Sequence, residues 1–420
     1  MRNIKKTIVA TIFFIFLLGT AFAQGLPGAK NPEEVGLLSE RLNRIDTVLK
    51  ADIEKGQIPG AVALVARKGK IAYLKGFGMR NKEKSLLMEK DSIFRVYSMT
   101  KSITAVATAM LMEEGKLLLS DPVAKYIPSF KDIQVGEIKK DESGKETLTL
   151  VAPSNVMTIQ DLLRHTSGLS YFFYPPRAIQ ERYMAAGMHK TEEMTNVEIC
   201  EKLAKLPLVA NPGTKYQYGM SYDVMGRVVE VISGMPLDKF FEERIYKPLK
   251  MKDSGFQVKG PDGNRLAYLD PKWPLYIDPT DSARRYMSGG GGTVSTAMDY
   301  ARFAQMLLNG GKIDGVRLLG PRTVAFMTSD HLGPMGNQDD ALYVPGRGYG
   351  VGFDYYVRVD AGHAYFLGNV GEFYKGGAAG TIFWVDPKED LIAVFMVSSP
   401  DYREHYRFLI KSLIYQAILR

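Results

Sequence analysis

The chain has 420 residues, of which 45% are hydrophobic, and a formal net charge of +8. A chain of this length and composition can bury a large core, and its length alone suggests two or three domains. The charge is modest and no basic block carries interleaved aromatic residues, so composition gives no support to nucleic-acid binding.

Residues 1–23 are typical of an export signal. Arg2, Lys5 and Lys6 form a basic start, an apolar run follows, and Ala21-Phe22-Ala23 has the small-x-small pattern of a cleavage site. The apolar run is shorter than the roughly 20 residues of a membrane span, although a retained N-terminal anchor is the alternative. We therefore expect an exported protein, periplasmic or secreted, without stable membrane insertion after signal cleavage.

The next segments predict a helix and a hairpin. Residues 37–54 carry apolar side chains at helical spacing, and the helix is expected to end before Pro59-Gly60. Residues 61–66 and 71–74 then have strand character on either side of a short turn that contains Gly69.

A Ser-x-x-Lys spacing follows, formed by Ser98 and Lys101 at the start of an apolar-periodic helix. Residues three apart on a helix are neighbours, so a hydroxyl and an amine are expected side by side at the positive end of the helix dipole. A serine hydroxyl becomes a good nucleophile when a base takes its proton, and a lysine can serve if its pKa, about 10.4 when free, is lowered. The spacing alone can also arise by chance.

From about 102 to 290 the pattern is mostly helical with long loops. Residues 131–156 are highly charged and predict an exposed excursion, and 159–163 predict a helix. The aromatic residues 171–174 are either a surface flap or the wall of an apolar pocket. Cys200 is the only cysteine, so no internal disulfide is expected, and its apolar neighbours indicate burial.

Two further motifs lie later in the chain. Tyr218 follows the Pro212-Gly213 turn and precedes a predicted helix at 224–232. The glycine run 289–292 precedes a predicted helix at 300–308, and we interpret the run as a tight turn, since no Walker-type sequence accompanies it.

The C-terminal part predicts strands and a final helix. The predicted strands are 349–357, 364–366, 381–385 and 391–397, and the helix is 401–419. The stretch Lys375-Gly376-Gly377-Ala378 carries small residues that would let a substrate lie against an edge strand and would leave backbone N–H groups free. Strands at both chain ends, with helices between them, predict one sheet and a helical insert.

At this point the chain resembles the β-lactamase-related serine hydrolases, a group that includes class C β-lactamases, family VIII-type carboxylesterases and D-amino-acid peptidases, and that is related to penicillin-binding proteins. The resemblance runs from about residue 31 to 420. It is carried by Ser98-Met99-Thr100-Lys101, Leu162-Leu163-Arg164-His165-Thr166-Ser167-Gly168-Leu169, Pro212-Gly213-Thr214, Tyr218, Gly290-Gly291-Gly292 and Gly376-Gly377-Ala378-Ala379-Gly380-Thr381.

The resemblance implies roles for these residues. Ser98 would be the acylated nucleophile, Lys101 would accept its proton, and Tyr218 would be a phenolic base whose pKa is lowered by Lys101 and Lys375. The oxyanion hole would be the N–H groups of Ser98 and Ala378, with Lys375, Gly376 and Gly377 beside the substrate.

Two departures from the family pattern bear on the substrate. Met220 stands where many members have the asparagine of a Tyr-x-Asn motif, which lowers the expectation of efficient β-lactam hydrolysis. Lys375-Gly376-Gly377 stands where many esterases have Trp-Gly-Gly, and a cation there would suit a substrate with a carboxylate. These departures point to different substrates, so ester, β-lactam and D-amino-acid peptide all stay open.

The resulting prediction is an α+β fold of the β-lactamase/transpeptidase type, with an antiparallel sheet built from both chain ends (about 31–95 and 290–420) and a mostly helical insert (about 96–289), all within one hydrolase domain at 24–420. We expect an enzyme that acts on small ester, amide or peptide substrates and needs no metal or cofactor, since the chain has no His-Glu-x-x-His and its nearest approach to a Gly-x-Ser-x-Gly elbow ends in Asp223. The alternative functions are a penicillin-binding or D-Ala-peptidase-like protein, or a sensor that is acylated and turns over slowly.

Overall fold

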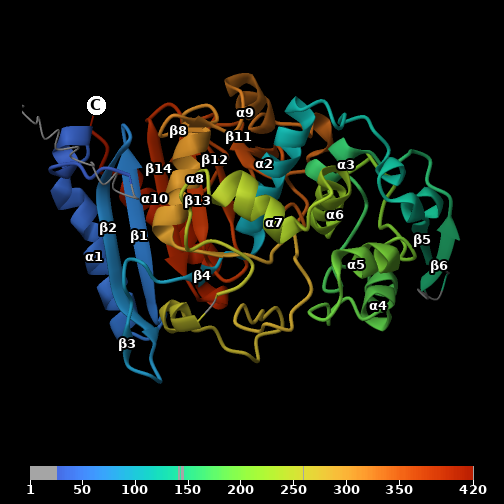
Figure 1. Cartoon of the computed structure of the whole chain (residues 1–420), viewed down its shortest axis with the longest axis horizontal. Coiled ribbons are helices and arrows are strands. Elements are labelled where there is room, and N and C mark those ends of the chain that lie inside the picture. Colours follow the sequence, from blue (N-terminus) through green and yellow to red (C-terminus); the bar gives the residue numbers. More distant parts are fainter. Residues whose placement is uncertain (1–25, 141, 143–145, 259, 420) are drawn as a thin grey trace, which may run out of the picture.

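The computed structural model describes residues 26–140, 142, 146–258 and 260–419; the predicted export signal lies outside the described residues. An antiparallel sheet with helices on both faces forms one side of the molecule, and a mostly helical part forms the other (Figure 1). This arrangement confirms the predicted α+β fold.

The main sheet has eight strands in the order β10-β11-β12-β13-β14-β1-β2-β3, and every neighbouring pair is antiparallel. Its strands come from both chain ends, as predicted: β1 (Gly60–Arg67), β2 (Lys70–Asn81), β3 (Leu86–Leu87), β10 (Tyr349–Val351), β11 (Tyr356–Arg358), β12 (Phe373–Gly376), β13 (Ile382–Asp386) and β14 (Leu391–Val397). The register of β1 on β14 pairs Ala61 with Val397 and joins the two ends of the chain at the centre of the sheet.

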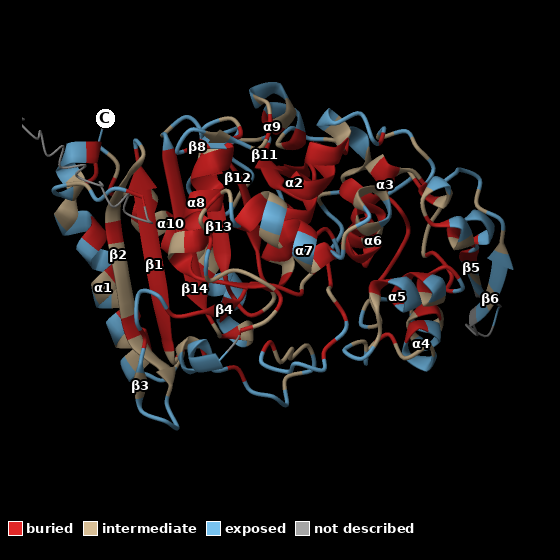
Figure 2. Ribbon diagram, in the orientation of Figure 1, coloured by how far each residue is buried: buried red, intermediate tan, exposed pale blue. Residues whose placement is uncertain are grey.

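Alternate residues of the central strands serve two separate cores. Val62 and Leu64 of β1 face the core that contains α8 (Ala297–Leu308), whereas Ala61 and Ala63 face α1 (Ser39–Glu54) and α10 (Arg403–Tyr415). A strand buried on both faces reads as a continuous apolar run, because both sets of side chains leave water. Figure 2 shows the central strands and α8 as buried. Each large apolar side chain that is fully buried stabilises the fold by about 1.5–3 kcal/mol.

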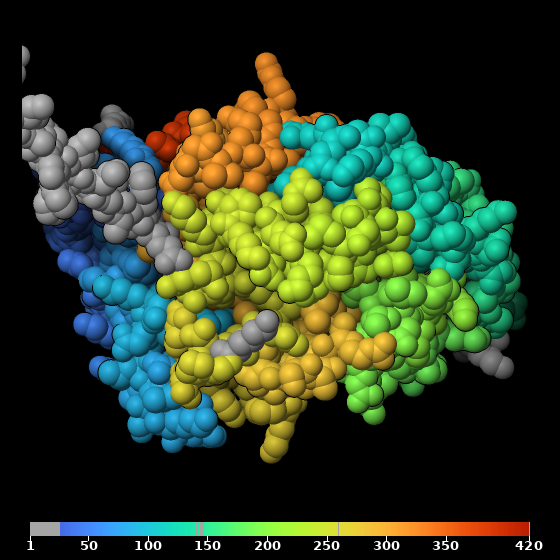
Figure 3. All heavy atoms as spheres, in the orientation of Figure 1, coloured from blue at the N-terminus to red at the C-terminus, as the bar shows by residue number. Residues whose placement is uncertain are grey.

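The helical part packs around α2 (Thr100–Glu113), which is buried from Thr100 to Leu111. Its other helices are α3 (Ile159–Leu163), α4 (Arg177–Ala185), α5 (Asn196–Leu203), α6 (Ser221–Ser233) and α7 (Leu237–Phe241), the last running into a π-helical turn (Glu242–Tyr246). The segment that follows α7, yellow in Figure 3, covers the face shown there between the blue first strands and the green helices.

Short elements complete the chain. They are β4 (Phe94–Arg95) paired with β7 (Val294–Ser295), β5 (Val135–Lys140) paired with β6 (Glu146–Val151), β8 (Lys312–Ile313) paired with β9 (Val316–Arg317), and α9 (Pro321–Met327). The charged segment 131–156, predicted as an exposed excursion, thus contains a hairpin at the outer end of the helical part (Figure 1).

Three strand predictions need correction. The single strand predicted at 349–357 is two strands, because Asp354 has a φ of +62° and the chain reverses there. Residues 364–366 form no strand, and Tyr365 is 74% exposed. Strand β12 is not at the sheet edge, although β11 pairs only with Phe373 and Tyr374 and leaves the later residues of β12 unpaired on that side.

Among the described residues no helix is long and apolar enough to span a membrane. Within the same residues no three His, Cys, Asp or Glu side chains are grouped closely enough to hold a metal ion.

Candidate active site

Ser98 lies on a single 3-10 turn (Tyr97–Met99) between β4 and α2. Tyr97, directly before it, has a φ of +44°, a conformation rarely adopted by a bulky residue. This strained turn brings Ser98 to the start of α2, and Lys101 follows on the first turn of the helix. The Nζ of Lys101 lies 3.4 Å from the Oγ of Ser98, as the spacing of the two residues predicts.

Lys101 is fully buried and donates to three oxygens. Besides Ser98 Oγ, they are the hydroxyl of Tyr171 at 3.3 Å and the carbonyl of Gly290. Although burial opposes a charge here, the oxygen of Tyr171 and the carboxylates of Asp354 and Asp223 raise the pKa of Lys101. An ammonium with all three protons donated fits this geometry, so Lys101 is the charged partner of Ser98 in the resting protein.

The glycine run has a structural task that its sequence did not reveal. Gly290 presents its carbonyl to Lys101, and its N–H donates to the Oδ1 of Asp223 at 3.3 Å. A Cβ at Gly290 would lie 2.4 Å from the Oδ2 of Asp223, so any other residue would collide with this carboxylate. The run is therefore a close backbone approach that holds the lysine in place.

Tyr218 approaches Ser98 from the other side. Its hydroxyl donates to the Oγ of Ser98 at 2.8 Å, across 120 residues of sequence. Burial raises the pKa of the Tyr218 phenol well above its usual value, and Asp354 adds to this shift. The expectation that neighbouring lysines lower this pKa was wrong, because desolvation of the phenolate outweighs the nearby positive charges.

Lys375 lies below Tyr218 with its charge already paired. Its Nζ is 2.5 Å from the Oδ1 of Asp354, and neither side chain is exposed to solvent. The same oxygen accepts from the Nε2 of His165 at 2.9 Å. The Lys375 ammonium also lies 4.8 Å from the centre of the Tyr218 ring. Lys375 is thus not free to bind a substrate carboxylate, contrary to the sequence-based expectation.

The end of β12 supplies the predicted backbone donors. A Cβ on Gly377 would lie 2.4 Å from the carbonyl of Val96, so this glycine lets the strand pack directly against the chain leading to Ser98. In the described part of the chain, neither the N–H of Ser98 nor that of Ala378 donates a hydrogen bond. Both residues line the same cavity, which leaves two backbone donors available for a developing oxyanion.

The cavity above Ser98 has a volume of about 260 Å³. Met220 lines it, together with Gly376 and Gly291. Charged side chains also line it, among them Arg403, Glu404 and Arg407. Its aromatic lining residues are Tyr97, Tyr171, Phe172, Phe173, Tyr174, Tyr218, Tyr276, Tyr286 and Tyr356. Of the two interpretations left open for residues 171–174, this position favours the pocket wall.

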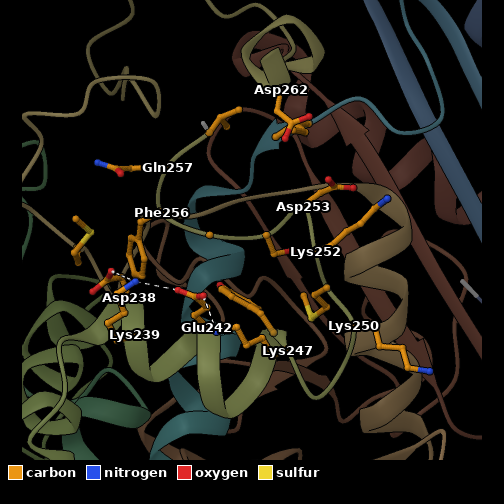
Figure 4. Close-up of a pocket in the computed structure, with 17 residues that line it drawn as sticks. Asp238, Lys239, Glu242, Lys247, Lys250, Lys252, Asp253, Phe256, Gln257 and Asp262 are labelled. Atoms are coloured by element: carbon orange, nitrogen blue, oxygen red, sulfur yellow. Dashed lines mark hydrogen bonds and ion pairs between the residues drawn. The ribbon is translucent and has the colours of Figure 1, made fainter. Parts of the chain in front are cut away.

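A larger cavity of about 640 Å³ lies beside α7 and the following π-helical turn (Figure 4). Some of its charged side chains pair with one another: Lys239 and Lys247 contact Glu242 at 3.1 and 2.9 Å. None of Ser98, Lys101 or Tyr218 lines it, so the larger cavity is separate from the candidate active site.

Several side chains that shape the site are not predicted by the sequence motifs. The sequence leaves Tyr171 in either a surface flap or a pocket wall and gives no sign of its contact with Lys101, and it predicts Asp354 inside a strand. His165 was marked only as part of a motif, yet its ring centre is 4.6 Å from that of Tyr218. The unusual position of an aspartate within the apolar run 349–357 was the one signal that could have drawn attention to Asp354.

The chain is similar to known proteins over most of its length. A family model described as Beta-lactamase matches residues 45–412. An uncharacterized protein of Mycobacterium tuberculosis is 33% identical over 359 residues, 82% of this chain and 86% of that protein. Esterase EstB of Burkholderia gladioli is 33% identical over 230 residues, 54% of each protein. The solved structure of EstCE1, a hydrolase with promiscuous acyltransferase activity, matches with a TM-score of 0.75 and 26% identity, covering 90% of this chain and 99% of EstCE1.

Proposed function

Because the chain belongs to the beta-lactamase family, we propose that it is a serine hydrolase that cleaves ester or amide bonds through an acyl-enzyme on Ser98. One observation carries the proposal: Lys101 Nζ and the Tyr218 hydroxyl lie 3.4 and 2.8 Å from Ser98 Oγ, and Ser98 and Tyr218 line one cavity. These are the nucleophile and proton-transfer groups that acyl transfer requires.

In the proposed reaction, Ser98 Oγ attacks the substrate carbonyl and its proton passes into the cluster formed with Lys101 and Tyr218. The carbonyl oxygen becomes negative and is stabilised by the N–H groups of Ser98 and Ala378. The Tyr218 hydroxyl, 2.8 Å from Oγ, is placed to deliver a proton to the leaving group. Water then hydrolyses the ester on Ser98 by the reverse sequence.

The resting cluster carries one proton more than this chemistry needs. Tyr218 is a neutral phenol, since burial raises its pKa, and Lys101 is charged, since its neighbours raise its pKa. The reactive form is therefore the one that has lost a proton from this cluster, and its population increases with pH.

An ester is the substrate that the cavity supports best. The aromatic wall favours an apolar acyl or alcohol group, and Met220 offers no hydrogen bond to an amide side chain. Pairing with Asp354 removes Lys375 as a partner for a peptide carboxylate, which leaves Arg403 and Arg407 as the cationic side chains that line the cavity. The similarity to esterase EstB also supports an ester substrate.

We further propose that residues 1–23 direct export, as their sequence pattern predicts.

Intact-mass trapping tests the proposal. The protein is mixed with a p-nitrophenyl ester, a D-alanyl peptide and a penicillin, and adducts are measured over time. We expect transient acylation and steady turnover with the ester, loss of both in Ser98→Ala, and retention of both in Ser102→Ala, which alters a buried serine of α2 outside the cavity. Turnover by Ser98→Ala at the wild-type rate would exclude the proposal. A long-lived adduct with penicillin and no ester turnover would instead support an acylated sensor.

A further inference from the structure

Arg407 of α10 reaches the backbone directly beside the proposed oxyanion hole. Its Nη2 donates to the carbonyl of Gly377, while its Nη1 donates to Glu404 at 2.7 Å. The guanidinium lies flat over Gly376, where a Cβ would come within 2.6 Å of its central carbon. The side chain is 13% exposed, so this contact is largely shielded from water.

The contact with the Gly377 carbonyl also fixes the direction of the Ala378 N–H. The C=O of Gly377 and the N–H of Ala378 belong to one planar peptide unit, and in a trans peptide they point in opposite directions. Holding the carbonyl toward α10 therefore holds the N–H toward the opposite side. Ala378 lines the cavity with Ser98, and its N–H donates to no other group in the described part of the chain.

A second bond holds the same carbonyl more locally. The N–H of Gly380 donates to the Gly377 oxygen at 3.1 Å within the turn that follows β12. This bond closes the turn but does not attach it to the rest of the protein. Arg407 attaches the Gly377 carbonyl to α10, and the N–H of Ser399 holds the far side of the turn by donating to the carbonyl of Ala379 at 2.8 Å. The glycines at 376 and 377 impose little preference on the backbone, so the Gly377 peptide depends on such contacts for its orientation.

We propose that Arg407 is a positioning residue that keeps the Ala378 N–H directed at the oxyanion formed during acyl transfer. The proposal rests on the proposed function of Ser98. Arg407 also lines the cavity, but the proposal requires of it no proton transfer and no contact with substrate. Arg407 acts through the orientation of one peptide unit.

Arg403 provides a matched control. It lies one turn earlier on α10, lines the same cavity and also contacts Glu404, at 3.3 Å. It has the same charge as Arg407, but it makes no hydrogen bond to the turn after β12 in the described structure. If loss of positive charge alone changed the oxo-to-thiono rate ratio, substituting either arginine would change it. If the effect acts through the Ala378 N–H, only substitution of Arg407 would change it.

The experiment compares Arg407→Met and Arg403→Met with an oxo ester and its thiono analogue, in which sulfur replaces the carbonyl oxygen. Sulfur accepts hydrogen bonds weakly, so the oxo-to-thiono rate ratio reports the strength of the oxyanion hole. For Arg407→Met we expect kcat for the oxo ester to fall about tenfold, KM to stay within about twofold, and the rate ratio to fall in parallel. Arg403 lines the substrate cavity, so Arg403→Met can change kcat or KM, but we expect its oxo-to-thiono rate ratio to stay within about twofold of wild type.

An unchanged rate ratio in Arg407→Met, or an equal fall in Arg403→Met, would overturn the inference. If Arg407→Met does not fold, the oxo-to-thiono rate ratio is measured for Arg407→Lys instead. This variant keeps the positive charge on a shorter side chain. The Ser98→Ala protein separates the two proposals. If Ser98→Ala is inactive and Arg407→Met is unimpaired, only the inference about Arg407 fails; if Ser98→Ala is fully active, the proposed function fails.

Discussion

The Nζ of Lys375 and the Oδ1 of Asp354 lie 2.5 Å apart, and both side chains are completely buried. This ion pair lies under the ring of Tyr218, and the carboxylate also accepts from the Nε2 of His165. The cation that the sequence places next to the cavity is therefore neutralised inside the protein. The ion pair therefore matters for stability, because a buried charge that has lost its partner raises the free energy of the folded protein.

Removing either member should destabilise the fold. Asp354→Asn, which suits the positive φ at this position, and Lys375→Met should each lower the free energy of unfolding by about 3–5 kcal/mol, because each leaves one buried group without its partner. The double variant should lose less than the sum of the two, since no uncompensated charge remains. Urea denaturation of the four proteins measures the coupling. Strictly additive losses would contradict this prediction.

Neighbouring glycines should respond very differently to alanine. A Cβ at Gly290 meets Asp223 at 2.4 Å, whereas at Gly291 the nearest atom is 3.8 Å away. Gly290→Ala should displace the carbonyl that holds Lys101, lowering kcat at least tenfold and stability by about 1–3 kcal/mol. Gly291→Ala should change both only slightly. Ester hydrolysis and thermal unfolding of the two variants test this, and equal behaviour would exclude the proposed support of Lys101.

Stability should fall in acid through His165. Burial lowers the pKa of His165 to about 4, against an ordinary value of 6.5, although Asp354 opposes this shift. Between these values the unfolded chain binds a proton that the folded chain does not. The free energy of unfolding should therefore decrease as pH falls from 6.5 to 4, by up to about 3 kcal/mol from this group.

The His165→Gln variant isolates that contribution. Its unfolding free energy, measured by urea denaturation from pH 7 to 4, should show a shallower decline than wild type by about the same amount. Parallel declines in the two proteins would show that His165 does not titrate in this range.

Activity should rise with pH. The pKa of Lys101 and that of Tyr218 are both raised, so the deprotonated reactive cluster is a minor form near neutrality. We expect kcat/KM for an ester to increase from pH 6 to 9 by up to about tenfold per unit, without a plateau. A plateau beginning near pH 7 would contradict this and would indicate Lys375 as the titrating base, because burial lowers the pKa of its amine to about 7.

Local patterns in the sequence were enough to identify several parts of this protein. The hairpin of β1 and β2, strand β14 and helices α6 and α8 follow from apolar periodicity and from turn or cap residues close in sequence. The pairing of Ser98 with Lys101 is likewise local, because three residues separate them on one helical turn. These features depend on interactions within a few residues, so the order of the residues alone determines them.

The remaining features of the site required the folded chain. Gly290 supports Lys101 across 189 residues, and Arg407 reaches Gly377 across 30. The raised pKa of Tyr218 and the pairing of Lys375 depend on how completely packing excludes water from them, which no neighbouring residue in the sequence specifies. The tertiary structure decided these features because desolvation and long-range contacts exist only after the sheet and the helical part have packed together.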